Sequence, residues 1–169
     1  GESYGTTRAS GLAGHLIEKG IAFNGILLVS SILNFLTARW FKGNDLPNIL
    51  FLPTYAATAW YHGKAAKKYT DLEKMLAEVE EFALGQYTSG LALCDRLSKR
   101  DRQAIARKLA DFTGLTPRYI EQTNLSSEIH RFCKKLLWED GMTGGMLESR
   151  FKGIDPRLIA EHPEFDPSR

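Results

Sequence analysis

The sequence has no long hydrophobic run, no excess of either charge and few cysteines. No apolar stretch reaches the roughly 18 residues that a transmembrane helix needs, so no membrane span is expected. The 22 basic and 20 acidic residues leave a net charge of +2, which gives no electrostatic reason for a nucleic acid or an anionic membrane as the obligatory partner. Hydrophobic residues make up 43% of the 169, which excludes a disordered chain and suits one domain with a sizeable core.

Residues that bind metal ions are also too scattered to form a site. Cys94 and Cys133 fit no metal-ligand spacing and no disulfide framework. They could form one bridge, but two buried thiols are the preferred interpretation. The acid-rich stretch 73–81 contains no histidine, so it is interpreted as a solvated helix face. We therefore expect neither a metal nor another cofactor.

The chain starts at Gly1, with no methionine, signal peptide or flexible tail before the first pattern. We expect that the start was processed or cut, or that the chain is an internal piece of a longer protein. Apolar residues at helical spacing predict a helix over residues 9–17, and Gly20 is placed to end it with a positive φ. The run 26–29 is short, apolar and β-branched, as is typical of a strand buried in a parallel sheet.

Beyond Ser30 the patterns are helical. The segment 50–61 is apolar around most of its circumference, which predicts a buried helix. Capping boxes at Thr70-x-x-Glu73 and Ser98-x-x-Asp101 each precede an apolar stripe, and Thr116-Pro117 starts a short helix. A last helix is predicted over 129–137 and closes near Gly141. One strand with about five helices predicts an unbalanced α/β protein that carries a helical insertion.

The first five residues carry the one chemically specific pattern. Gly1-Glu2-Ser3-Tyr4-Gly5 matches G-x-S-x-G, the nucleophile elbow, in which a serine sits on a sharp strand-to-helix turn. Glycines flank the serine because a Cβ on either side is expected to clash. The turn exposes the serine hydroxyl and leaves the next backbone N–H as an oxyanion donor. The alternative is an ordinary glycine-serine turn.

Gly1 to Tyr4 resemble the active-site motif of the serine carboxypeptidase-like family of the α/β-hydrolase clan. The stretches 20–26, 51–63 and 148–153 are similar to the bacterial branch of that family. The resemblance implies a partial α/β-hydrolase fold: residues 1–36 would form a core segment with the elbow, and residues 37–169 a largely helical cap and the start of the return to the core. It also implies a parent enzyme that releases C-terminal amino acids from peptides and is periplasmic or secreted.

The resemblance assigns roles to three residues. Ser3 would be the acylating nucleophile, and the backbone N–H of Tyr4 would be an oxyanion donor. Glu2 would bind the C-terminal carboxylate of the substrate; one of the two carboxylates must then carry a proton, which favours acidic pH. The alternative for Glu2 is an ordinary acid beside the turn. The family usually has Ala-Gly where this chain has Gly5-Thr6, which leaves the packing around the elbow open.

The triad that such an enzyme needs is incomplete here. The order Ser, Asp, His requires a histidine after a late acid, and only His162 meets it, in a turn-rich tail. We interpret His162 as a surface residue and His15, His62 and His130 as structural. In the family the triad Asp and His would lie downstream of this chain and the other oxyanion donor upstream. The remainder of the parent chain is therefore an expected partner, and this chain alone is expected to be inactive.

Two further features bear on function. The aromatic residues Tyr55, Trp60, Tyr61 and Tyr87 could line a substrate pocket or simply pack in the core. The spacing Ala110-x₃-Gly114-x₅-Ile120, around residues 104–122, fits a helix-turn-helix with a basic approach helix, so a DNA-binding or interaction module is the alternative function. The recognition helix would be only about a turn and a half long, and the low net charge favours a packed helix hairpin.

Overall fold

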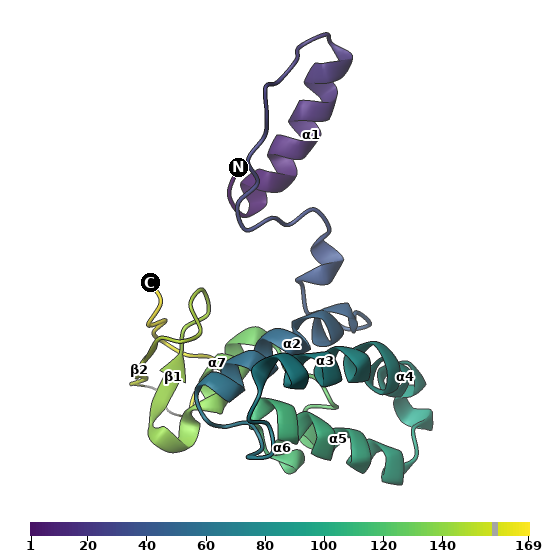
Figure 1. Cartoon of the computed structure of the whole chain (residues 1–169), viewed down its shortest axis with the longest axis vertical. Coiled ribbons are helices and arrows are strands. Elements are labelled where there is room, and N and C mark those ends of the chain that lie inside the picture. The colour runs from purple at the N-terminus through teal and green to yellow at the C-terminus, as the bar shows by residue number, and fades with distance from the viewer. Residues whose placement is uncertain (157–158) are drawn as a thin grey trace. The chain divides into compact units, whose positions relative to one another are not determined.

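The computed structural model describes residues 1–156 and 159–169 and forms two compact units, unit 1 (Gly1–Pro47) and unit 2 (Asn48–Arg169). The described residues are 54% helix and 5% strand, and their strands form one two-stranded sheet (Figure 1). The predicted α/β class, a partial α/β-hydrolase fold, is therefore wrong for this chain. A central parallel sheet needs several strands that pair side by side, and the described residues do not supply them. The predicted functional division at residue 36 stays a prediction.

Unit 1 contains one long helix. Helix α1 (Tyr4–Glu18) starts directly after Ser3 and is followed by Gly20 with a φ of 80°, as the sequence predicted. A 3₁₀ turn follows at Phe35–Thr37. The strand predicted over 26–29 is reduced to a single parallel bridge between Glu2 and Val29.

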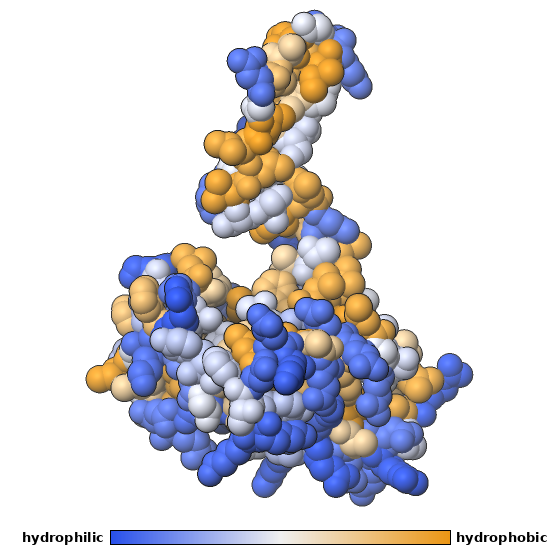
Figure 2. Space-filling model, in the orientation of Figure 1, coloured by the Kyte–Doolittle hydropathy of each residue, from blue (hydrophilic) through white to orange (hydrophobic). Residues whose placement is uncertain are grey.

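The side chains of that extended segment lie on the surface, which corrects the prediction of a buried strand. Their exposed fractions run from 37% at Leu28 to 84% at Leu27. Further hydrophobic residues of unit 1 are exposed as well (Figure 2), among them Ile21, Phe23 and Leu33. An apolar run buries itself only if a second layer covers it, and within unit 1 α1 leaves these residues uncovered.

Unit 2 is a set of packed helices with a small hairpin near its end. Its elements are α2 (Leu46–Tyr61), which starts at the unit boundary, α3 (Leu72–Phe82), α4 (Thr88–Leu93), α5 (Lys99–Thr113), α6 (Pro117–Gln122), α7 (Ile129–Leu136), β1 (Met142–Gly144) and β2 (Lys152–Ile154). The strands are antiparallel, with Thr143 opposite Gly153. Within the described ranges no helix combines the length and hydrophobicity that a bilayer crossing requires.

Local sequence rules set most of the helix starts. Ser98 caps α5 by accepting a hydrogen bond from the Asp101 N–H, and Thr116 caps α6 in the same way with Pro117 at the first position, as predicted. The predicted box at Thr70 is wrong by one residue. Asp71 is the N-cap of α3 and accepts from the Lys74 N–H at 3.1 Å, because its carboxylate is the better acceptor for a helix N-terminus.

The core of unit 2 is built around aromatic rings. The ring of Phe82 lies 5.9 Å from that of Tyr87 and 5.6 Å from that of Phe112. A π-helical segment, Ala83–Tyr87, joins α3 to α4. In an α-helix, residues five apart point about 140° away from each other. The wider π turn brings Tyr87 to the side of Phe82, so the two rings stack nearly parallel.

Unit 2 contains a buried charged pair. Lys134 of α7 is 3% exposed and Asp155, just after β2, is 2% exposed. Lys134 Nζ lies 2.5 Å from Asp155 Oδ2. Burial of either charge alone would be costly, so the pair fastens the segment after the hairpin to α7.

We expect Asp155→Ala to lower the free energy of unfolding by about 3–5 kcal/mol, because it removes the carboxylate that neutralises a buried ammonium. Urea denaturation followed by circular dichroism measures this change. Asp140→Ala is the matched control, since Asp140 forms an ion pair with Lys64 at the surface and its loss should hardly move the midpoint. Equal shifts for the two variants would contradict a special role for the buried pair.

Candidate functional site

Ser3 occupies a strained turn between the bridge to Val29 and the start of α1. Its φ is 52° and its ψ is −125°, a conformation that costs a residue other than glycine about 1–3 kcal/mol. The Ser3 N–H donates to the Val29 carbonyl at 3.0 Å, and the Val29 N–H donates to the Gly1 carbonyl at 2.9 Å. A single bridge, a strained serine and a helix thus follow one another directly, which is the local order of a nucleophile elbow without the parallel sheet that carries one.

The two glycines that flank the Ser3 turn differ in the space around their Cα atoms. A Cβ on Gly1 would lie 2.3 Å from the Gly5 carbonyl oxygen, so only glycine fits there. A Cβ on Gly5 would meet nothing within 4 Å among the described residues. The expected clash on both sides is therefore correct for Gly1 and wrong for Gly5.

Thr6 stands where the family usually has glycine, a difference that left the packing around the turn open. Its side chain is fully buried; Oγ1 donates to the Ser3 carbonyl at 2.6 Å and accepts from the Ile32 N–H at 3.0 Å. The Thr7 hydroxyl donates to the Ile32 carbonyl. Two neighbouring threonines therefore tie the first turn of α1 to the segment that follows Val29.

The backbone N–H that follows Ser3 is free of any acceptor among the described residues. The N–H groups of Gly5 and Thr6 donate to the carbonyls of Glu2 and Ser3. The N–H of Tyr4, the first residue of α1, has no acceptor within the part of the chain that the structure describes. It lies at the positive end of the helix dipole, next to the serine, which suits an oxyanion donor. The Glu2 side chain is exposed at the same end.

Unit 1 supplies no base for Ser3. Its one histidine, His15, lies twelve residues along α1, which corresponds to a rise of about 18 Å. In unit 2, His62 Nε2 lies 2.7 Å from the Ser149 carbonyl oxygen, so this imidazole has a structural contact. The sequence interpretation as structural fits the contact of His62, whereas His15 is exposed on α1 and its role stays a prediction.

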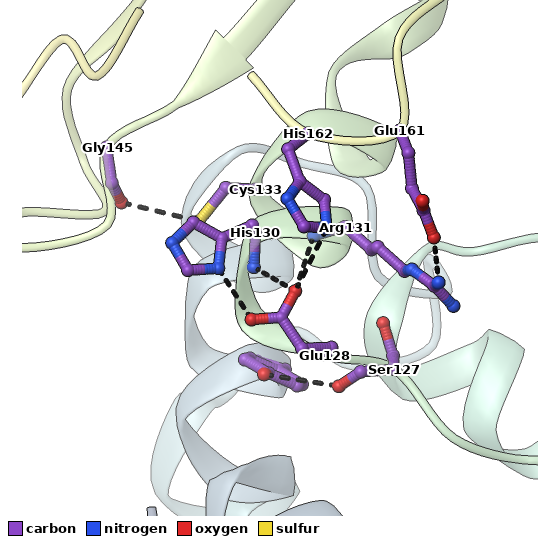
Figure 3. Close-up of polar contacts among 9 residues, drawn as sticks. Ser127, Glu128, His130, Arg131, Cys133, Gly145, Glu161 and His162 are labelled. Atoms are coloured by element: carbon purple, nitrogen blue, oxygen red, sulfur yellow. Dashed lines mark hydrogen bonds and ion pairs between the residues drawn. The ribbon is translucent and has the colours of Figure 1, made fainter. Parts of the chain in front are cut away.

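The other two histidines share one carboxylate (Figure 3). His130 Nδ1 lies 2.6 Å from Glu128 Oε1, and His162 Nε2 lies 4.0 Å from Glu128 Oε2. The two rings stack with centroids 5.3 Å apart. Glu128 also caps α7 by accepting from the N–H of His130 and of Arg131. Sequence reasoning missed this cluster, although an acid directly before a helical pattern could have indicated the cap. No group of three ligands in the described ranges could hold a metal ion.

The two cysteines are free thiols in different surroundings. Cys133 is buried beside a pocket of about 430 Å³ that His130 also lines. Burial raises the pKa of the Cys133 thiol to about 12. Cys94 is exposed, so the prediction of two buried thiols is correct for Cys133 and wrong for Cys94.

The aromatic residues considered for a substrate pocket lie in different surroundings. Tyr55 is 4% exposed and stacks on Phe132 at 4.1 Å, and burial raises the pKa of its hydroxyl. Trp60 Nε1 donates to the Tyr69 carbonyl at 2.9 Å, while Tyr61 is 57% exposed. Tyr55 lines a space of only about 20 Å³, so it acts as a core residue in unit 2.

The helix-turn-helix spacing corresponds to α5, a left-handed Gly114 with a φ of 70°, and α6 with Ile120 buried. Basic residues of α5 are engaged within the chain, since Lys108 pairs with Glu78 and Arg102 donates to Asn124. Helix α6 is six residues long. These contacts are those of a packed helix hairpin.

No protein-family model, curated protein or solved structure matches this chain. The geometry and chemistry of its own residues are therefore the basis for assigning a function.

We expect a thiol reagent such as DTNB to modify one cysteine quickly at pH 8 in the folded protein. Cys94 is exposed, whereas the Cys133 thiol is buried and stays protonated because of its raised pKa. Cys94→Ser should remove the fast phase, and Cys133→Ser should leave it intact; absorbance of the released thiolate follows both. Fast modification of Cys133 in the native protein would contradict its burial.

Proposed function

We propose that Ser3 is the acylating nucleophile of a serine-type carboxypeptidase, which releases C-terminal amino acids from peptides. The observation that carries the proposal is the strained backbone of Ser3, held between the Val29 bridge and α1. Positive φ at a serine is uncommon, and such strain is concentrated at sites where a reactive group must be presented.

The surrounding residues support the steps of acyl transfer. The Ser3 hydroxyl would attack the scissile carbonyl, and the free N–H of Tyr4 would stabilise the oxyanion that forms. Glu2, exposed beside Ser3, would bind the C-terminal carboxylate of the peptide through a shared proton. Departure of the terminal amino acid leaves an ester on Ser3, which water then hydrolyses. A serine needs a base, and because unit 1 supplies none, the histidine and its aspartate must come from outside it.

In the native protein we expect a fluorophosphonate probe to label Ser3. Ser3→Ala should abolish labelling and lower kcat/KM on a blocked dipeptide by about 10⁴–10⁶-fold, because the nucleophile is lost. Ser10→Ala, within α1, is the control and should retain both. Mass spectrometry locates the probe, and a labelled serine other than Ser3 would overturn the assignment.

The two glycines give a second, independent test of the turn. Gly1→Ala should strongly reduce labelling of Ser3, because its Cβ cannot fit beside the Gly5 carbonyl. Gly5→Ala should retain most of the labelling, because space is open there. Labelling rates with the same probe measure both variants. Equal loss in the two would show that this turn is not what presents the serine.

A further inference from the structure

One face of α7 continues into the turn after it and carries mostly cationic and aromatic side chains. Arg131, Lys134, Lys135 and Trp138 follow the spacing i, i+3, i+4 and i+7, which places them on the same side of a helix. Together with Tyr119 of α6 and with Glu161 they line a pocket of about 220 Å³. This pocket belongs to unit 2 and is separate from the Ser3 turn.

The lining of this pocket has three basic residues and one acidic residue, and an acid outside the lining neutralises one of the two excess positive charges. Lys134 is neutralised by Asp155, and Arg131 Nη2 pairs with Glu161, as Figure 3 shows. Lys135 makes aromatic contacts instead: its Nζ lies 4.3 Å from the ring centroid of Trp138 and 5.6 Å from that of Tyr119. Among the residues with described positions, no carboxylate pairs with Lys135.

Besides the unpaired ammonium of Lys135, the guanidinium of Arg131 has a hydrogen-bond donor without an acceptor within the described ranges. Its Nε is buried and has no hydrogen-bond acceptor among the described residues. A buried donor without an acceptor is costly, while the Arg131 side chain as a whole is 41% exposed and so remains accessible to a ligand. The planar guanidinium matches the two oxygens of a carboxylate, and the ammonium of Lys135 adds charge without a fixed geometry.

We propose that this pocket binds a small carboxylate with a flat apolar body. The carboxylate would accept hydrogen bonds from Arg131 and Lys135, and the body would lie against the rings of Tyr119 and Trp138. The pocket is smaller than the 300–1,000 Å³ or so of sites for drug-sized ligands, so a molecule of about ten heavy atoms suits it. The aromatic walls favour such a ligand over a bare inorganic anion. This site does not depend on the reaction proposed for Ser3.

The test compares 3-phenylpropionate with its neutral amide, 3-phenylpropionamide, which has nearly the same shape. Each is titrated into the ¹⁵N-tryptophan-labelled chain, and the indole signal of Trp138, assigned with Trp138→Phe, is followed by NMR. We expect a saturable shift with the acid and at least about tenfold weaker binding of the amide, because the amide lacks the charge. Equal binding of acid and amide, or no saturable shift of Trp138, would overturn the proposal.

Variants separate the pocket from general attraction to a basic surface. Lys135→Gln should lower the affinity for the acid about tenfold, and Lys135→Arg should retain it. Lys99 is an exposed lysine at the start of α5, so Lys99→Gln should leave the affinity unchanged. The thermal midpoint of each variant verifies that it is folded. Unchanged affinity in Lys135→Gln, or competition by inorganic phosphate at the same concentration as the acid, would overturn the assignment.

Discussion

A buried ammonium has to be neutralised, and Asp155 meets this requirement for Lys134. The constraint reaches beyond the pair itself, because Asp155 lies just after β2 and so links the hairpin and the tail to α7. The tail in turn brings Glu161 to Arg131 and His162 to Glu128. Both clusters at the start of α7 therefore involve a tail that is held by this charge pair and by the contacts of Asp166 and Ser168 with residues 146 and 147.

Unit 1 follows a different principle, since its structure is set by backbone hydrogen bonds rather than by a core. The Ser3 turn is held by the Val29 bridge on one side and by Thr6 on the other. Few hydrophobic side chains of this unit are buried. Strain at Ser3 can persist because several short polar contacts restrain it together.

Sequence rules correctly predicted the features that depend on contacts between residues close together in the chain. The caps at Ser98 and Thr116, the positive φ of Gly20 and the helix directly after Ser3 all follow from contacts within a few residues. The strand predicted at 26–29 was wrong because a strand requires partners that its own sequence does not specify. The pocket of about 220 Å³ beside Lys135 combines residues from α6, α7 and the tail, so only the spacing of its α7 residues was visible in the sequence.

The π-helical segment Ala83–Tyr87 has a consequence for how related chains should be compared. A π turn is equivalent to an α-helix with one additional residue. Removal of that residue would let α3 and α4 run as one regular helix and would rotate α4 by about 100° about the axis, which takes Leu91 out of its buried position. A one-residue gap within 83–87 in a sequence alignment would thus mark a change in how α4 faces the core, although the helix itself would appear intact.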